Sequence, residues 1–164
     1  MLDRLAIPAG NVHRIRGEDP PGQSAAAYER TLRELLGTPT GGPQSAPGRQ
    51  LDLVLLGLGV DGHTASLFPG LRAVREVERW AVAECVNAVP SGRITLTPRV
   101  INAAAEVVFV VSGTEKSSML KQVLSDPHDP DLLPSQIIAP TSGCLRWMVD
   151  TPAASQLNAD CTSR

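Results

Sequence analysis

The stretch LVLLGLGVDGHTASLFPG, residues 53–70, decides the fold class. Together with residues 51 and 52 it begins as an apolar run without alternation, which predicts a strand covered on both faces in a parallel sheet. Three glycines follow within six residues, then Asp61, His63 and a Pro-Gly pair that ends the segment. In open α/β sheets, ligands bind beyond the carboxyl ends of the strands. We therefore expect a ligand-binding loop at residues 57–63.

Further strands and helices are predicted along the chain. Apolar runs at residues 80–86, 106–112 and 144–149 predict strands. A helix is predicted over residues 22–37, with Ser24 as its N-cap and an internal Glu29/Arg33 pair. Thr97-Pro98 opens a second helix in the preferred order of N-cap and N1 proline, and a third spans residues 114–124. The pattern predicts an α/β fold with an open, mostly parallel sheet and helices on both faces.

Composition limits the class of protein. Of 164 residues, 42% are hydrophobic and 20% are charged, which is typical of a globular protein. The formal net charge is −2, whereas surfaces that bind duplex nucleic acid carry an excess of basic residues, so no nucleic acid partner is expected. There is no charged-then-apolar leader and no apolar run approaching the length of a membrane span, so no membrane association is expected. The expected compartment is the cytoplasm. The Gly/Pro/Ser/Thr-rich residues 37–49 are expected to form a surface loop.

No metal or thiol chemistry is predicted. Cys85, Cys144 and Cys161 are odd in number and widely separated, which argues against a disulfide framework or a thiolate metal site. The segment DPHDPD, residues 126–131, lacks the spacing of zinc ligands, and its prolines restrict the chain, so we interpret it as a solvated loop. No G-x-S-x-G elbow is present. We therefore predict a functional site that holds neither a metal ion nor a cofactor.

The glycines of the opening stretch allow more than one interpretation. Gly57, Gly59 and Gly62 spell G-x-G-x-x-G after a strand, and Glu84 lies about twenty residues on, where a dinucleotide fingerprint needs its ribose-binding acid. That fingerprint must also open a long helix, and here Pro69-Gly70 interrupts the chain. The plain alternative is a tight turn whose histidine is a surface or capping residue.

A catalytic interpretation rests on the side chains of the same loop. His63 is the side chain best suited to take and give a proton near neutral pH, and Asp61 is placed to orient its ring or to bind a substrate hydroxyl. The glycines let the backbone approach a ligand closely.

Two cations are candidates for binding an anion. Lys116 lies in the first turn of a helix, where the macrodipole disfavours a positive charge and a bound phosphate or carboxylate removes the conflict. A solvated lysine, or one paired with Glu115, is the alternative. Arg93, just ahead of residues 94–98, is able to clamp a phosphate, although one arginine in a polar loop is usually a surface residue.

Three collinear segments carry a family resemblance: GLGVDGHTASLFPG, RITLTPRVINAAAEVVFVVSGTEKSSMLKQVL and LPSQIIAPTSGCLRWMVDTPAA. The chain resembles the 6-phosphogluconolactonases of the glucosamine/galactosamine-6-phosphate isomerase superfamily. The resemblance implies a sugar-phosphate isomerase-like fold, no cofactor, and hydrolysis of 6-phospho-D-glucono-1,5-lactone. It implies His63 as general base and then acid, oriented by Asp61, with Lys116 and Arg93 facing the phosphate. Backbone N–H groups of the loop at Gly57, Gly59 and Gly62 are expected to contact substrate.

The resemblance also leaves alternatives. Related deaminases follow Asp-Gly-His with Asn-Glu-Pro, and Phe68 stands here in the place of their acid, which disfavours the deaminase/isomerase activity. The family begins with a strand leading to a Ser-Gly-Gly loop and later has an Asp-Glu-Arg stretch, both of which would precede residue 1. Residues 1–164 are therefore expected to form a single, N-terminally truncated domain. An inactive remnant that still binds sugar phosphates or a protein is the second hypothesis.

Overall fold

A computed structural model describes residues 4–37, 50–86 and 89–157. The predicted surface loop at residues 37–49 lies almost entirely outside these ranges. All statements below concern the described residues.

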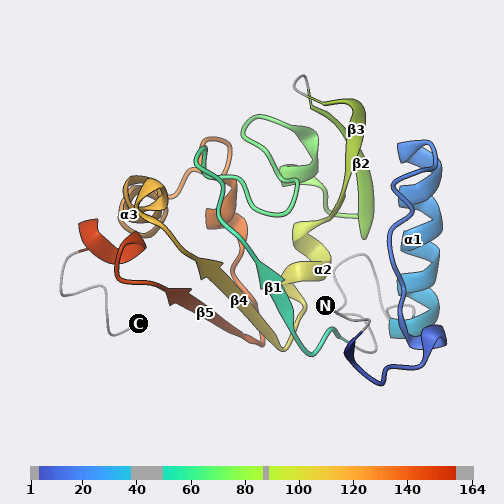
Figure 1. The fold of residues 1–164 in the computed structure, drawn as a ribbon. Helices are drawn as coiled ribbons and strands as arrows, with labels where there is room; N and C mark the ends of the chain where they lie inside the picture. Colours follow the sequence, from blue (N-terminus) through green and yellow to red (C-terminus); the bar gives the residue numbers. More distant parts are fainter. Residues whose placement is uncertain (1–3, 38–49, 87–88, 158–164) are drawn as a thin grey trace.

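A three-stranded parallel sheet forms the centre of the fold (Figure 1). Strands β1 (Val54–Leu56), β4 (Glu106–Val111) and β5 (Cys144–Val149) lie in the order β1-β4-β5. Their register aligns Leu56 with Phe109 and Phe109 with Trp147. The strands predicted at residues 51–56, 106–112 and 144–149 are thus confirmed, as is the α/β class with an open parallel sheet and helices. The expected cover on both faces of the sheet is not seen among the described residues, since Leu55, Val110 and Met148 are 62%, 52% and 62% exposed.

The segment at residues 80–86 is a strand, as predicted, but it lies outside the parallel sheet. It forms β2 (Ala81–Val86), which pairs antiparallel with β3 (Val89–Leu96) in a separate two-stranded sheet. The second strand was not predicted. In it, Arg93 and Thr95 alternate with Ile94 and Leu96, the period of a strand with two different faces.

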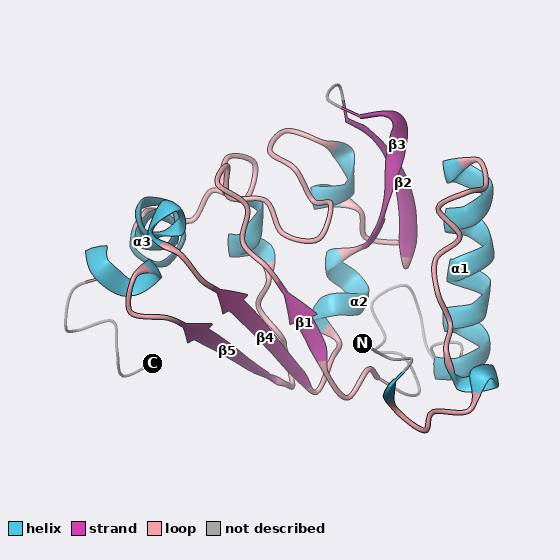
Figure 2. Ribbon diagram, viewed as in Figure 1, coloured by secondary structure: helices cyan, strands magenta, loops and turns pink. Residues whose placement is uncertain are grey.

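Helix α1 (Pro21–Leu36) lies against this hairpin and not against the parallel sheet (Figure 2). Ser24 is not its N-cap: the cap position is Pro20, and the buried Ser24 hydroxyl donates to the Arg16 carbonyl at 2.6 Å. Prolines at positions 20 and 21 fix φ near its helical value, which starts the helix a turn earlier. Leu32, Trp80 and Val100 form the small core between helix and hairpin.

The remaining helices are short. They are α2 (Pro98–Asn102) and α3 (Ser117–Ser125), with 3₁₀ turns at Ala9–Asn11, Arg72–Arg75, Thr114–Lys116, Pro134–Ile137 and Ala153–Gln156. Thr97 occupies the N-cap of α2 as predicted, but its hydroxyl donates to the Arg79 carbonyl at 2.7 Å instead of capping the helix. The third helix is confirmed, beginning with the 3₁₀ turn that holds Lys116.

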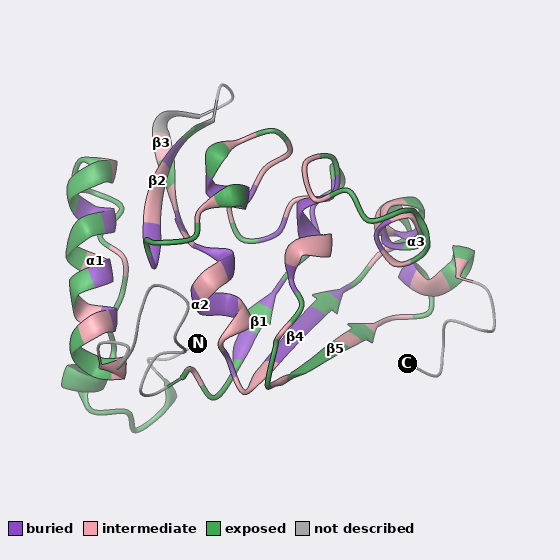
Figure 3. Cartoon of the chain, turned by 180° about the vertical axis from the view of Figure 1, so that it is seen from behind, coloured by how far each residue is buried: buried purple, intermediate pink, exposed green. Residues whose placement is uncertain are grey.

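The main core lies on one face of the parallel sheet. Phe109 is fully buried and its ring stacks on Trp147, with centroids 4.0 Å apart. The same face packs on residues from α2, α3 and the loop after β1, among them Leu67, Ile101, Ala104 and Leu120. Figure 3 shows α2 over this face in the view from behind. The core thus holds the loop at residues 57–70 against the carboxyl end of β1.

Candidate active site

The loop at residues 57–63 leaves β1 at its carboxyl end, as the sequence predicts, and closes on itself. The Gly59 N–H donates to the His63 carbonyl at 2.8 Å, and the Gly62 N–H donates to the Gly59 carbonyl at 3.2 Å. Gly62 has φ +81°, a conformation that side-chain-bearing residues rarely adopt. Both N–H groups donate within the loop, so Gly59 and Gly62 shape it; the predicted contact of Gly57, Gly59 and Gly62 with substrate stays a prediction.

The loop brings His63 and Asp61 together as predicted. His63 Nδ1 lies 2.5 Å from Asp61 Oδ1, and the His63 backbone N–H donates to the same oxygen at 3.2 Å. Partial burial raises the pKa of Asp61, but the hydrogen bonds from His63 outweigh it and leave that pKa below its usual value. An ionised carboxylate accepts, so Nδ1 is the donor in this contact, and in the neutral form of the imidazole the lone pair then lies on Nε2. The pair can therefore take a proton from a water molecule.

Neighbouring residues hold this pair in place. The Phe68 ring lies 4.3 Å from the His63 ring, tilted by 33°. Both the Ser135 hydroxyl and its backbone N–H donate to the Gly62 carbonyl, at 2.8 and 3.0 Å. Sequence reasoning missed Ser135, since it lies more than seventy residues away and belongs to no local motif. The imidazole retains access to solvent, with 30% of the side chain exposed.

Gly59→Ala is expected to separate His63 from Asp61. A Cβ at Gly59 would overlap the His63 ring and lie 2.6 Å from Asp61 Oδ1, so one of the two side chains must move. Overpacking of this kind costs about 1–3 kcal/mol. We expect loss of the single Nδ1–H tautomer, measured by ¹⁵N NMR of the histidine ring, and at least a tenfold lower kcat/KM.

Gly57→Ala is the matched control for the tautomer. It adds the same methyl group two residues earlier, where a Cβ would meet nothing within 4 Å. The His63 spectrum should therefore stay as in the parent chain. An unchanged spectrum in Gly59→Ala would contradict the close packing of Gly59 under the pair.

Lys116 lies at the same end of the sheet. It ends the 3₁₀ turn after β4, the neighbour of β1, and is half-buried. One turn further on, the Met119 sulfur lies 3.3 Å from the position that a Cβ on Gly62 would take, so the start of α3 borders the loop. In the described part of the chain, Lys116 forms no ion pair, either with its neighbour Glu115 or with any other carboxylate. Its ammonium group is available to an anion.

The turn before Lys116 is held by Asp150, a residue that sequence reasoning missed. The Asp150 carboxylate accepts from the Ser112 hydroxyl at 2.5 Å, from the Ala153 N–H at 2.9 Å and from the Gly113 N–H at 3.1 Å. These hydrogen bonds, that of Ser112 first, lower the pKa of Asp150. The Gly113 N–H at this helix start is therefore already paired and is not available to an anion. Asp150 directly follows a predicted strand, a position typical of functional acids in α/β folds.

Arg93 is exposed on β3 and stands apart from the other predicted site residues. It lies on the same face of the hairpin as Thr95, whose hydroxyl oxygen accepts the Ser66 N–H at 3.2 Å. This contact joins the Arg93 strand to the segment after His63. Within the described ranges no hydrogen bond or ion pair joins Arg93 to His63 or Lys116.

The dinucleotide interpretation is excluded by two observations. Glu84, its ribose-binding candidate, is buried and accepts the Ala73 N–H at 3.0 Å. In addition, no α-helix opens at Gly62, since the next helical element is the 3₁₀ turn Arg72–Arg75. The G-x-G-x-x-G pattern of Gly57, Gly59 and Gly62 therefore belongs to a tight turn and not to a dinucleotide site.

The DPHDPD segment is exposed over most of its length, and its Asp131 pairs with Arg75. Across residues 4–37, 50–86 and 89–157, no three His, Cys, Asp or Glu side chains gather as metal ligands. Over the same ranges, every helix is too short or too polar to cross a bilayer.

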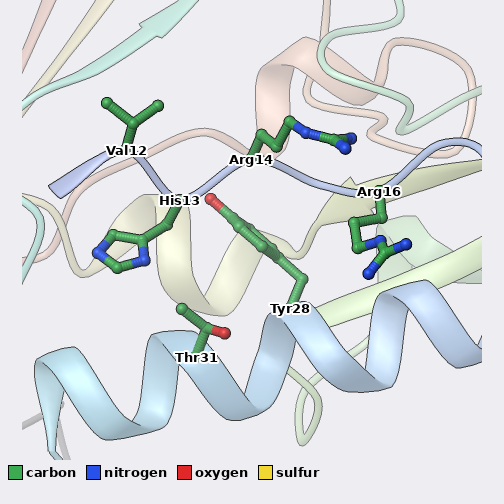
Figure 4. Close-up of a pocket in the computed structure, with 6 residues that line it drawn as sticks. All are labelled: Val12, His13, Arg14, Arg16, Tyr28 and Thr31. Atoms are coloured by element: carbon green, nitrogen blue, oxygen red, sulfur yellow. The ribbon is translucent and has the colours of Figure 1, made fainter. Parts of the chain in front are cut away.

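A separate hollow of about 400 Å³ lies between residues 12–16 and α1 (Figure 4). It is lined by Val12, His13, Arg14, Arg16, Tyr28 and Thr31. Arg14 pairs with Glu18 at 2.6 Å and Arg16 with Asp19 at 2.9 Å, so carboxylates already offset its positive charge. None of the predicted site residues borders this hollow, and we do not place substrate there.

Fold and site together define an open α/β domain with a hydrogen-bonded Asp61–His63 pair at the carboxyl end of its first strand. The family model of glucosamine-6-phosphate isomerases/6-phosphogluconolactonase matches residues 1–147. The chain belongs to this family.

The chain is also similar to individual proteins of known sequence or structure. The chain is 41% identical to a 6-phosphogluconolactonase of Nostoc sp. over 160 residues, covering 96% of this chain and 62% of the relative. It is 34% identical to the probable 6-phosphogluconolactonase 3, chloroplastic, of Oryza sativa subsp. indica, covering 97% of this chain and 50% of the relative. The crystal structure of devB protein superposes with a TM-score of 0.84 at 30% identity, covering 96% and 63%. The chain thus spans half to about three fifths of these relatives' lengths.

Proposed function

We propose that this chain provides the hydrolytic centre for conversion of 6-phospho-D-glucono-1,5-lactone to 6-phosphogluconate. The observation that carries the proposal is the His63–Asp61 pair, with Nδ1 directed at the carboxylate and Nε2 free. The similarity to relatives named 6-phosphogluconolactonase supports the choice of substrate. The cytoplasm is the proposed compartment, although one relative is named chloroplastic.

His63 moves the proton in both steps of the proposed reaction. Nε2 removes a proton from water as the water oxygen bonds to the lactone carbonyl carbon, giving a tetrahedral intermediate. Collapse of that intermediate breaks the bond between this carbon and the ring oxygen, and the imidazolium returns the proton to the departing oxygen. Asp61 holds the ring orientation and stabilises the imidazolium.

Lys116 and Arg93 are the proposed cations for the substrate phosphate. Lys116 borders the loop through the first turn of α3 and has no competing carboxylate among the described residues. Asp150 contributes indirectly, because its bond to the Gly113 N–H fixes the turn that carries Lys116. Arg93 is exposed on the hairpin that the Thr95–Ser66 hydrogen bond joins to the segment after His63, and its contact with the phosphate is part of the proposal.

Phe68 disfavours the deaminase/isomerase alternative. Its ring packs against the His63 imidazole with centroids 4.3 Å apart. By the resemblance to the deaminases, Phe68 stands at the position of their acid, so an apolar side chain replaces a proton carrier. Lactone hydrolysis needs no second proton carrier there.

The test compares three substrates. We expect the chain to hydrolyse 6-phospho-D-glucono-1,5-lactone above its spontaneous rate, to act at least tenfold less well on the unphosphorylated lactone, and to release no ammonia from glucosamine 6-phosphate. Lys116→Ala should narrow the preference for the phosphorylated lactone, because it removes a charge-assisted contact worth about 1.5–3 kcal/mol. Saturable binding of 6-phosphogluconate without turnover would instead support the sugar-phosphate-binding remnant.

A further inference from the structure

One peptide unit joins the Asp61–His63 pair to a distant segment of the chain. The unit between Gly62 and His63 donates its N–H to Asp61 Oδ1 at 3.2 Å. The carbonyl oxygen of the same unit accepts two hydrogen bonds, from the Ser135 hydroxyl at 2.8 Å and from the Ser135 N–H at 3.0 Å. Because a peptide unit is planar, a contact that fixes its oxygen also fixes the direction of its N–H. Ser135 therefore acts on the contact with Asp61 through a rigid plane.

The orientation of this peptide unit depends on contacts from outside the loop. Gly62 has φ +81° and no side chain, and glycine changes its backbone conformation more freely than other residues do. Among the described residues, the hydrogen bonds to the Gly62 carbonyl come from Ser135. The two segments are also in close contact, since a Cβ on Gly62 would lie 3.4 Å from the Leu133 Cα. The Ser135 segment thus supplies the restraint that glycine lacks.

The segment that carries Ser135 is itself anchored. Ser135 lies in the 3₁₀ turn Pro134–Ile137 and is 1% exposed. The side chain of the next residue, Gln136, accepts the Asp129 N–H at 2.7 Å. Its Nε2 donates to the Val123 carbonyl, in the last turn of α3, at 3.2 Å. Two adjacent side chains therefore connect the loop at the end of β1 with α3.

The hydrogen bonds of this peptide unit also favour the charge on Asp61. Hydrogen bonds to a carbonyl oxygen polarise the peptide and strengthen its N–H as a donor. Partial burial raises the pKa of Asp61, and the hydrogen bonds from the His63 ring and from the His63 N–H outweigh that effect. A weaker His63 N–H donor would reduce the second of these contributions.

The Ser135 hydroxyl does not act on substrate itself. A residue that is 1% exposed offers no surface to a substrate, and its hydroxyl proton is committed to the Gly62 carbonyl. A serine nucleophile needs an accessible oxygen and a base that takes its proton. The contacts of Ser135 are those of a residue that orients another one.

We propose that Ser135 is a positioning residue for His63. It holds the Gly62–His63 peptide so that the His63 N–H and the ring Nδ1–H both point at Asp61. The inference rests on the proposed role of His63 in hydrolysis and adds a residue that acts on it without touching substrate.

Ser135→Ala and Ser135→Cys test the catalytic consequence. Alanine removes the hydroxyl and keeps the backbone N–H, so one of the two hydrogen bonds to the Gly62 carbonyl is lost. We expect kcat for the phosphorylated lactone to fall about tenfold, because a misplaced base loses rate steeply. KM should change by less than about twofold, since the proposed phosphate cations are untouched. Cysteine should behave like alanine, because a thiol fills the space of the hydroxyl but donates weakly.

NMR of the free chain tests the structural step without substrate. The His63 amide proton is held by Asp61, and in Ser135→Ala it should exchange with solvent about tenfold faster. The ¹⁵N signals of the His63 ring should show partial loss of the Nδ1–H tautomer. A serine that only stabilised the fold would change neither signal.

Ser24→Ala is the matched control. Ser24 is 3% exposed and its hydroxyl donates to the Arg16 carbonyl at 2.6 Å, so the substitution removes the same kind of contact from α1. It should lower the thermal midpoint as Ser135→Ala does. It should leave kcat and the His63 signals as they are in the parent chain.

The outcomes separate this inference from the proposed function. Unchanged kcat in folded Ser135→Ala, with an active parent chain, would overturn the role of Ser135. Unchanged exchange of the His63 amide proton, or an equal loss of kcat in Ser24→Ala, would overturn it as well. A parent chain that does not hydrolyse the lactone would instead overturn the proposed function. The NMR comparison would then still decide whether Ser135 holds the Gly62–His63 peptide.

Discussion

His63→Ala is expected to reduce hydrolysis of 6-phospho-D-glucono-1,5-lactone to its spontaneous rate. A positioned general base and acid contributes about 10²–10⁴-fold to such reactions, and alanine supplies neither the proton acceptor nor the donor. Asp61→Asn should also lower the rate, because an amide at that position no longer favours the Nδ1–H tautomer that leaves Nε2 free. Initial rates, corrected for spontaneous hydrolysis, measure both effects.

His128→Ala is the control for this experiment. His128 is exposed in the loop at residues 126–131 and makes no hydrogen bond or ion pair with Asp61 or His63 among the described residues, so its removal should change the rate by less than twofold. Both variants are checked for folding by circular dichroism. Full activity of folded His63→Ala would refute the proposed role of the histidine.

The parallel strands were predictable because each lies in a short, largely apolar run of sequence. Residues 106–111 are almost uniformly apolar, and the loop after residues 51–56 follows from the glycines and the Pro-Gly stop. The hairpin was missed because Arg93 and Thr95 interrupt its second strand with polar side chains. Of these two, Thr95 accepts the Ser66 N–H, a contact that depends on the tertiary fold.

The candidate site was predictable only where its residues are neighbours in sequence. Asp61 and His63 lie two residues apart, and a tight turn brings them into contact. Ser135 and Asp150 were not predictable in the same way, because each binds a backbone group from a distant segment. Glu84 shows the reverse error: its spacing suggested a ligand contact, whereas its carboxylate satisfies a buried N–H.

Glu29→Ala is expected to destabilise the contact between α1 and the hairpin by about 2–4 kcal/mol. The Glu29 side chain is only 7% exposed and accepts hydrogen bonds from Arg33 at 2.7 Å, from Arg79, and from the buried Trp80 N–H at 3.2 Å. Alanine leaves the Trp80 N–H without a partner. Glu34→Ala, at an exposed position of the same helix, should change the free energy of unfolding by less than about 0.5 kcal/mol.

The contribution of Glu29 should also depend on pH. Burial raises the pKa of Glu29, but the hydrogen bonds from Arg33, Arg79 and Trp80 outweigh it and hold that pKa below its usual value. A group with a lowered folded-state pKa binds protons more weakly than in the unfolded chain, so its stabilisation is complete above the unfolded pKa of about 4.3 and is lost as the pH falls below it. Urea unfolding at pH 7, 5, 4 and 3 should therefore show the difference between the parent chain and Glu29→Gln shrinking toward acid pH. A difference that stays constant down to pH 3 would show that the charge of Glu29 does not stabilise the fold and that its value lies in packing alone.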